Sequence, residues 1–334
     1  MLSSGSADLA VDLGTARTRI ANAAGLLLDE PTAIALHKGR SLAAFGNEAL
    51  EMQDRAPQGV SVIRPIQGSV ITDFDGTEKL LRVLLKQAGG SWLRGPRVLI
   101  SVPLQIAEVE RRAVMESARA AGAREVTLVA TCMAAAVGVE LPVAQPVGSI
   151  LVDCGAGHTE VTVLSAGGVV EHAWSPVGGD AMDEAIVQWL ARTHHMAIGQ
   201  RTAEKVKRRI GCAVQSPKRT SMTVRGRHLS NRRPREAEVN TDDMAAALAH
   251  SVIIVRDVIT ATLQATAPEL AADIHDRGLI LCGGAAQLTH LDHVLRETTT
   301  LPILLAEQPD HAVVRGCARL LEDPPLLATL GDGS

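Results

Sequence analysis

The fold of this chain is decided by a stretch that occurs twice, LAVDLGTARTRIANAAG at residues 9–25 and ILVDCGAGHTEVTVLSAGG at residues 150–168. Each copy has an apolar run ending in Asp-x-Gly, then three residues, a threonine, and alternating apolar and polar residues. The aspartate, glycine and threonine keep their spacing: Asp12, Gly14 and Thr18 in one copy, Asp153, Gly155 and Thr159 in the other. Each copy therefore predicts a strand, a tight turn and a second strand.

The sequence around the two copies predicts two related α/β domains. Each copy continues into a third strand-like stretch, LLLDEPTAIAL or VVEHAWSPVGG. Strand–helix units follow, the first opening with RVLISVP at residues 97–103 and the second with GLILCGG at residues 278–284. We expect a mixed sheet in each domain, with the antiparallel hairpin first and parallel strands later. Residues 32–75 and 181–245 predict an insertion in each half.

Composition excludes several functional classes. The 334 residues are 46% hydrophobic and 21% charged, with a net charge of −4, so no strong positive field attracts nucleic acid. There are three Trp, two Phe and no Tyr, which leaves few platforms for base stacking. Five cysteines without a CxxC pair argue against a disulfide scaffold or a structural zinc site. The N-terminus lacks the pattern of a signal peptide, and we expect a cytoplasmic protein.

The two Asp-x-Gly turns are candidate phosphate sites. Tight turns of small residues expose backbone N–H groups that phosphate oxygens can approach. An aspartate beside a polyphosphate repels it unless a divalent cation lies between them. A single such turn is usually an ordinary β-turn, but two at the same place in repeated units favour a nucleotide site.

Other motifs are weaker on their own. CGG at residues 282–284 follows a strand, as expected of a loop near a purine or of a generic strand–helix turn. The segment TAEKVKRRIGCA (202–213) is charged on one face, which is also typical of a solvated helix. The basic segment 218–235 lacks interleaved aromatics and predicts a solvated or partner-facing surface. Cys132 has no evident histidine partner, so a thiol nucleophile is disfavoured.

Many collinear stretches resemble the bacterial actin homologues MreB and Mbl, of the actin, sugar kinase and heat-shock chaperone superfamily. They include VDLGTARTRI, DEPTAIAL, VIRPIQGSVITDF, MAAAVGVELPV, VDCGAGHTEVTV, VGGDAMDEAI, TAEKVKRRIG and GLILCGGAAQLTHLD. The resemblance covers nearly the whole chain and implies an α/β actin-like fold. In that fold two duplicated RNase H-like domains each carry a smaller subdomain, with ATP and Mg²⁺ in a cleft between them.

The resemblance also implies four subdomains and a cytoskeletal function. The expected bounds are 1–31, 76–146 and 313–334 for subdomain IA, 32–75 for IB, 147–180 and 246–312 for IIA, and 181–245 for IIB. Family members polymerise into filaments on the inner face of the cell membrane and organise cell-wall synthesis and cell shape. The implied partners are other copies of the chain, the inner membrane surface, and cell-wall synthesis and morphogenesis proteins, with no nucleic acid.

Matching the family motifs residue by residue implies a set of site residues. The first phosphate loop is Gly14, Thr15, Ala16 and Arg17, and the second is Gly155, Ala156, Gly157 and His158. The nucleoside would be held by Glu204, Lys205, Val206, Lys207, Gly283, Gly284, Ala285 and Ala286. The hydrated Mg²⁺ would be held by Asp12 and Asp153.

The chain departs from the family pattern at several of these positions. Arg17 stands where the family has Asn, and Gly155-Ala156-Gly157-His158 stands where it has three glycines and Thr. Ala285 replaces a third glycine. Thr131 occupies the position of the glutamate that polarises the attacking water, and Cys132 replaces a proline. We therefore expect slow or absent ATP hydrolysis, since losing one water-positioning group costs about 10²–10⁴-fold in rate.

The sequence also predicts a membrane contact and a helix cap. The family's membrane-binding loop falls at Trp92 and Leu93, which predicts either an interfacial anchor or a partly buried plug. Thr131 otherwise predicts a helix N-cap. Two alternative functions stay open: a competent ATPase in which another group, such as His158, replaces the glutamate, and a non-polymerising regulatory or scaffold protein of the same fold.

Overall fold

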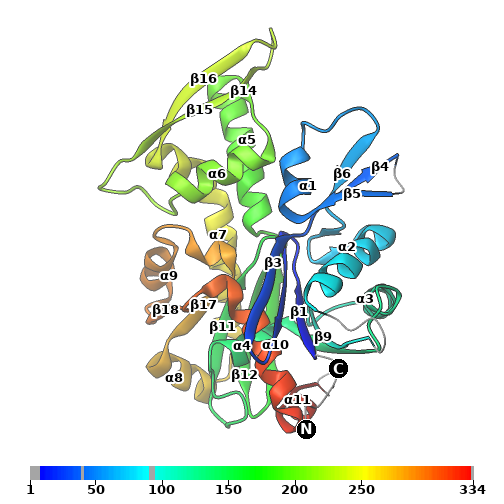
Figure 1. Cartoon of the computed structure of the whole chain (residues 1–334). Coiled ribbons are helices and arrows are strands. Elements are labelled where there is room, and N and C mark those ends of the chain that lie inside the picture. Colours follow the sequence, from blue (N-terminus) through cyan, green and yellow to red (C-terminus); the bar gives the residue numbers. More distant parts are fainter. Residues whose placement is uncertain (1–7, 39–40, 90–94, 332–334) are drawn as a thin grey trace. The chain divides into compact units, whose positions relative to one another are not determined.

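A computed structural model describes residues 8–38, 41–89 and 95–331 of the chain (Figure 1). The chain divides into two compact units. Unit 1 contains residues 1–146, 166–168 and 310–334, and unit 2 contains residues 147–165 and 169–309. The finer division into four subdomains stays a prediction.

Unit 1 is built on a five-stranded mixed sheet in the order β10-β9-β1-β2-β3. Its strands are β10 (Glu125–Ala130), β9 (Arg97–Val102), β1 (Leu9–Leu13), β2 (Arg17–Asn22) and β3 (Gly25–Pro31). The first three strands in the sequence form an antiparallel meander, whereas β9 runs parallel to both β1 and β10. This is the arrangement that the first copy of the repeat predicts.

The two faces of the unit 1 sheet are covered by different helices. Leu9 and Val11 of β1 belong to the same buried cluster as Leu80 and Leu84 of α2 (Phe74–Gln87). Successive strand residues face opposite sides, so Ala10 and Asp12 lie on the other face. There α10 (Ala312–Glu322) contacts β1, β2 and β9 (Figure 1). The helix α3 (Glu108–Ala120) packs beside α2, and α11 (Pro324–Gly331) beside α10.

Two glycines bring α10 into backbone contact with α4 (Thr131–Gly138). A Cβ atom on Gly316 would lie 1.6 Å from the carbonyl oxygen of Ala134, and one on Gly138 would lie 1.8 Å from that of Ala312. No real Cβ atom approaches so closely, so these two helices can meet in this way only where both residues are glycine. All residues of α4 after Thr131 are buried.

Residues 32–75, predicted as an insertion, form a small subassembly of unit 1. Its three-stranded sheet has the order β5-β4-β6 and is accompanied by a short helix and a two-stranded ribbon. The elements are β4 (Ile34–His37), β5 (Ser41–Phe45), α1 (Gly46–Met52), β6 (Val60–Ile63), β7 (Ile66–Gln67) and β8 (Val70–Ile71). Four buried alanines give it a small core: Ala33, Ala35, Ala44 and Ala49.

Unit 2 repeats the same sheet plan in the order β13-β12-β11-β17-β18. Its strands are β11 (Ser149–Cys154), β12 (Thr159–Ser165), β13 (Gly168–Ser175), β17 (Leu279–Cys282) and β18 (Ile303–Leu305). Val152 and Val161 join the main buried cluster with residues of α5 (Gly179–His194), α7 (Thr241–Ala265) and α9 (Leu291–Thr299). The helix α8 (Pro268–Arg277) contacts β11.

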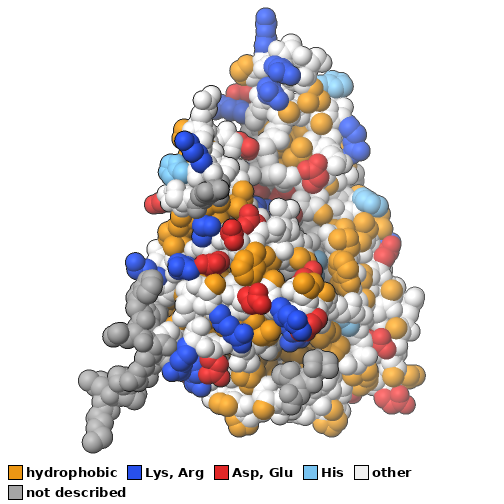
Figure 2. All heavy atoms as spheres, turned by 90° about the vertical axis from the view of Figure 1, so that its right-hand side faces the viewer, with side chains coloured by type: hydrophobic (Ala, Val, Ile, Leu, Met, Phe, Trp, Pro, Cys, Tyr) orange, Lys and Arg blue, Asp and Glu red, His pale blue; other side chains and the backbone are white. Residues whose placement is uncertain are grey.

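The insertion of unit 2 contains a helix and a second sheet. After α5 come β14 (Met196–Ala197), α6 (Gln200–Ile210), β15 (Ser221–His228) and β16 (Pro234–Asn240). The basic segment 218–235 forms most of the β15–β16 hairpin, where Arg219 and Arg225 pair with Asp242 and Glu236. Figure 2 shows Lys and Arg side chains interspersed with Asp and Glu over the face in view, in keeping with the small net charge of −4.

Among the described residues, α7 alone has the length and apolar composition of a membrane-spanning helix. The positions of its apolar side chains explain this composition more simply. Met244, Leu248, Val252, Val255 and Ile259 recur at helical spacing and are buried in the core of unit 2. The apolar character of α7 is therefore that of a core helix.

The contact between α4 and α10 gives a stability prediction. Gly316→Ala should lower the free energy of unfolding by about 3 kcal/mol or more, because the added methyl group forces the two backbones apart. Urea denaturation followed by circular dichroism measures the change. As a control on the same helix, Ala318→Gly should cost only about 1 kcal/mol. A Gly316→Ala protein as stable as the wild type would show that the helices do not meet in this way.

Candidate functional site

Each Asp-x-Gly turn is closed by the same hydrogen bond. In unit 1 the N–H of Gly14 donates to the carbonyl of Arg17 over 3.1 Å. In unit 2 the N–H of Gly155 donates to the carbonyl of His158 over 3.0 Å. The equivalence extends into the strands, because the residue after each aspartate pairs with the threonine of the return strand, Leu13 with Thr18 and Cys154 with Thr159. Both predicted phosphate loops are thus the same turn in the same place.

The second loop is anchored to the start of α5. The N–H groups of Gly179 and Asp180 donate to the carbonyls of Gly155 and Ala156, over 3.0 and 2.9 Å. A Cβ atom on Gly178 would lie 2.5 Å from the carbonyl oxygen of Ala156. The loop is therefore held rigidly against the helix N-terminus, whose dipole favours a nearby anion.

The predicted nucleoside loop of unit 2 approaches Asp153. Gly283 has φ +86°, and a Cβ atom there would lie 2.3 Å from both Asp153 Oδ1 and the carbonyl oxygen of Cys154. Gly283 is therefore required by its conformation and by its surroundings. Gly284, Ala285 and Ala286 follow directly in a short 3₁₀ helix (Gly284–Gln287), with both alanines buried.

Asp12 lies in a ladder of charges across three strands. Arg19 is directly opposite Asp12 on β2, and Asp29 is directly opposite Arg19 on β3. Opposed residues share a face of the sheet, here the face that α10 covers. Nη1 of Arg19 lies 3.7 Å from Asp12 Oδ2, and its Nε lies 3.3 Å from Asp29 Oδ1. From the start of the α10 segment, Asp310 accepts a 3.0 Å hydrogen bond from Nη2 of Arg19.

Burial and charge act in opposite directions in this ladder. Burial raises the pKa of Asp12 to about 6, although the charge of Arg19 opposes it. Burial also acts to raise the pKa of Asp29, but the hydrogen bond from Arg17 and the charges of Arg19 and Arg17 outweigh it. The pKa of Asp29 therefore lies below its ordinary value. Asp29 is therefore the firmly ionised partner of the arginines.

Arg17, a predicted phosphate-loop residue, is engaged within unit 1. Its Nε donates to Asp29 Oδ1 over 2.5 Å, and its Nη2 donates to the Asp29 carbonyl over 2.6 Å. Arg17 and Arg19 are two apart on β2 and so lie on one face. A phosphate contact by Arg17 would have to compete with this pairing.

The equivalent ladder of unit 2 has different chemistry. Glu160 lies directly opposite Asp153, and Glu160 Oε1 is 2.7 Å from Nε2 of His172 on β13. Both side chains of this pair are over nine-tenths buried. Burial lowers the pKa of His158, two residues before Glu160, whose charge acts in the opposite direction. In this unit the aspartate therefore faces a carboxylate, whereas in unit 1 it faces a guanidinium.

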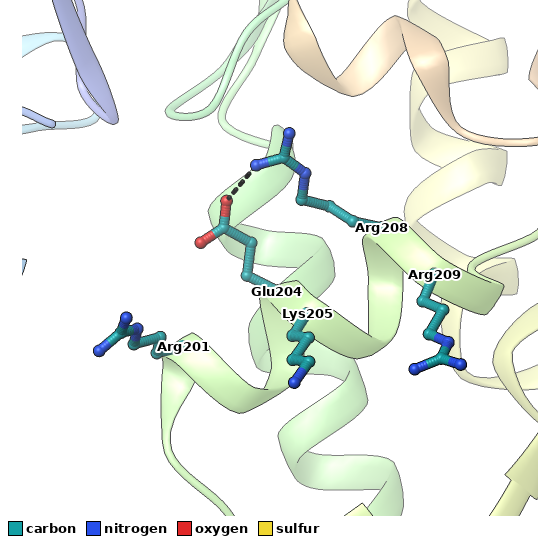
Figure 3. Close-up of a pocket in the computed structure, with 5 residues that line it drawn as sticks. All are labelled: Arg201, Glu204, Lys205, Arg208 and Arg209. Atoms are coloured by element: carbon teal, nitrogen blue, oxygen red, sulfur yellow. Dashed lines mark ion pairs between the residues drawn. The ribbon is translucent and has the colours of Figure 1, made fainter. Parts of the chain in front are cut away.

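The charged residues predicted on α6 separate into two groups. Figure 3 shows Glu204 and Arg208 turned toward each other, 3.6 Å apart, on the wall of a hollow open to solvent. Its other lining residues are Arg201, Lys205 and Arg209. Val206 is buried in the core.

Lys207, in contrast, is turned toward α5. Its Nζ lies 2.9 Å from Asp183 Oδ1 and donates to the carbonyl of Gly179 over 2.6 Å. The sequence did not single out Asp183. These contacts join α6 to the start of α5, which anchors the second phosphate loop. The observed role of Lys207 is therefore to hold these two helices together.

Thr131 is the first residue of α4, and the N-cap prediction for it is wrong. Ala130 holds the cap position, and no side chain caps the helix. The chain leaves the strand β10 at Ala130, so the helix begins one residue earlier than an N-cap threonine requires. Cys132 is buried, as expected of a small core residue.

The predicted membrane residues Trp92 and Leu93 lie outside the described residues. Among the described residues, no group of three or more His, Cys, Asp and Glu side chains could hold a metal ion. The Mg²⁺ that the resemblance implies at Asp12 would meet a fixed guanidinium there, and the environment of this carboxylate does not fit that ion.

Comparison with known proteins identifies the family. A profile of the MreB/Mbl protein family matches residues 6–328. The chain belongs to the MreB/Mbl family. It is 42% identical over 323 residues to the cell shape-determining protein MreB of Escherichia coli K12, covering 94% of this chain and 93% of that one. It is 35% identical over 319 residues to Mbl of Bacillus subtilis 168, with 95% and 96% covered.

Solved structures agree with this assignment. MreB5 of Spiroplasma citri bound to ADP matches with a TM-score of 0.90 and 28% identity, covering 96% of this chain and 97% of that one. The MamK double helical filament matches with a TM-score of 0.80 and 20% identity over 95% and 99%, which bears on the fold alone. The predicted actin-like fold is confirmed: the chain is an actin-like member of a family of cell shape-determining proteins.

The contact between Asp183 and Lys207 gives a pH-dependent prediction. Burial raises the pKa of Asp183 to about 6, while Lys207 acts against the shift. Because the folded state favours the protonated carboxyl, this group destabilises the wild type as the pH rises from about 4 to 6, by up to about 3 kcal/mol. Asparagine does not titrate.

The free energy of unfolding of Asp183→Asn, minus that of the wild type, should therefore increase by up to about 3 kcal/mol from pH 4 to pH 7. Urea titrations at the two pH values measure this, with Glu184→Gln on the exposed side of α5 as the control. A difference that stays constant with pH would contradict the assigned environment of Asp183.

Proposed function

We propose that this chain binds ATP and assembles into filaments that organise cell-wall synthesis and cell shape, with weak or absent ATP hydrolysis. The observation that carries the proposal is the pair of equivalent Asp-x-Gly turns, each closed by the same glycine hydrogen bond. Turns of small residues admit phosphate oxygens close to the backbone. Each unit therefore offers one such turn to a phosphate group.

Solved structures of relatives support the proposed nucleotide binding. The structures of Spiroplasma citri MreB5, at 28% and 27% identity, were solved with ADP and with AMPPNP bound. In this chain, the proposed nucleoside ligands of unit 2 are Glu204 and Lys205, which line the α6 hollow, and the Gly283–Ala286 loop beside Asp153. Lys207 would contribute by holding α6 in place.

Assembly and location follow from the family. We propose that the partners are further copies of the chain, the inner membrane surface, and proteins of cell-wall synthesis and morphogenesis. The filament location would be peripheral, on the cytoplasmic side. Trp92 and Leu93 are the proposed contacts with the membrane, where an interfacial tryptophan and a neighbouring leucine would insert.

Thr131 is the reason to expect weak ATP hydrolysis. The residue at the start of α4 carries a hydroxyl where the family has the water-activating glutamate. A threonine hydroxyl does not serve as a base at neutral pH, so the attacking water loses its polarising group.

The competing ATPase hypothesis has one specific observation in its favour. Burial lowers the pKa of His158, which favours the neutral imidazole, the form that a general base needs. His158 belongs to the second phosphate loop and would then act in place of the missing glutamate. Measured phosphate release decides between this hypothesis and the leading one.

Replacing the threonine tests the account of hydrolysis. Thr131→Glu should raise the rate of phosphate release by about 10²-fold or more above a wild type close to background, because it restores the carboxylate. Thr131→Gln, of similar size without the charge, should stay at the wild-type rate. Calorimetric titration with ATP should show binding by all three proteins. Wild-type release as fast as that of Thr131→Glu would favour His158 as the base.

A further inference from the structure

We propose that Arg19 supplies the positive charge that a divalent cation would supply at Asp12, so that nucleotide binding by this chain depends little on Mg²⁺. The inference rests on the proposed nucleotide binding. Arg19 is not among the site residues that the family resemblance implies. The inference concerns whether the nucleotide site needs a divalent cation.

The strand register places Arg19 at Asp12. The two residues are directly opposite on β1 and β2, with Nη1 of Arg19 3.7 Å from Asp12 Oδ2. The other Asp12 oxygen, Oδ1, accepts from the hydroxyl of Ser101 over 3.5 Å. Each carboxylate oxygen thus has a polar neighbour within unit 1, and the side chain is 14% exposed.

The guanidinium of Arg19 is held in place from three directions. Its side chain is 9% exposed and lies within ion-pair distance of Asp12, Asp29 and Asp310. A buried charge is expensive unless it is paired, so this cage of carboxylates keeps Arg19 where it is. Arginine stays protonated in proteins, which makes the positive charge permanent.

The geometry leaves Arg19 with unused capacity on the side of its Nε. This atom is buried and has no hydrogen-bond partner, although Asp29 Oδ1 lies 3.3 Å away. Asp29 is instead shared with Arg17, which donates two hydrogen bonds to it. The charge of Arg19 is therefore shared among Asp12, Asp29 and Asp310, and Asp29 alone does not neutralise it.

A permanent cation at this place opposes Mg²⁺. The ion binds carboxylates within a strict octahedral shell and keeps several waters. At Asp12 that shell would have to form beside a fixed guanidinium, which repels it and competes for the same oxygens. Arg19 at the same time offsets the repulsion between Asp12 and an incoming phosphate, which is the service that the metal would otherwise perform.

The two units differ in this respect. Asp153, the corresponding aspartate of unit 2, faces Glu160, and the cross-strand partner of Glu160 is the imidazole of His172. No arginine lies opposite Asp153 on its paired strand. The proposed replacement of a metal ion by an arginine therefore applies only to Asp12 of unit 1.

Calorimetric titration of ATP into the full chain, in Mg²⁺ and in EDTA, tests the proposal. For the wild type the two dissociation constants should agree within about threefold. Loss of affinity by more than about tenfold in EDTA would overturn it, since the metal would then be needed despite Arg19. Failure to bind ATP in either buffer would reject the proposed function and with it this inference.

Variants at the same position add a matched comparison. Arg19→Leu should bind ATP with a clear Mg²⁺ requirement, about tenfold or more between the two buffers, because Asp12 becomes free to ligate the ion. Arg19→Lys keeps the charge and should resemble the wild type. Thermal unfolding establishes that each variant is folded, and Arg19→Leu/Asp310→Asn removes a carboxylate that loses its hydrogen bond from Arg19. A folded Arg19→Leu protein that stays indifferent to Mg²⁺ would contradict the role of Arg19.

Discussion

The hydrogen bond from the glycine N–H of each Asp-x-Gly turn to the carbonyl three residues later is the constraint on which the rest of the structure depends. It fixes the register of β1 with β2 and of β11 with β12. A shift by one residue would exchange the two faces of a strand. Asp12 and Asp153 would then lie in the apolar cores, and Val11 and Val152 would leave them.

The same register lets the two halves diverge in chemistry while they keep one fold. Across three strands, unit 1 presents Asp12, Arg19 and Asp29, whereas unit 2 presents Asp153, Glu160 and His172. One ladder contains a permanent cation and the other an imidazole. Backbone hydrogen bonds determine the geometry that the two units share. Side chains on one face of each sheet determine the charge, which can therefore differ between the units.

Much of the fold was predictable from sequence because its signals are local. The two hairpins and their glycine turns form as predicted, and family resemblance supplies the architecture. The stretch LLLDEPTAIAL, predicted as one strand, instead forms β3 and β4 in two different sheets. The partners of charged side chains were not predictable in this way. Arg17 was assigned to phosphate, yet its nearest carboxylate is Asp29. For Arg19 the sequence alone gives no signal of a role.

The reason is that these contacts depend on register and on distant segments. The alternation along β2 could have placed Arg17 and Arg19 on one face, but Asp310 reaches Arg19 from 291 residues away in the chain. Thr131 shows a smaller failure of the same type, because α4 begins directly after β10, one residue earlier than an N-cap threonine requires. Local propensity does not contain that information.

The central claim is that this chain is a nucleotide-dependent cytoskeletal filament protein. Sedimentation of the purified protein with ATP, with ADP and without nucleotide, together with negative-stain electron microscopy of the pellets, tests it most directly. The account predicts filaments that pellet with ATP and a protein that stays in the supernatant without nucleotide. A protein that fails to pellet under every condition, including on anionic liposomes, would contradict the claim.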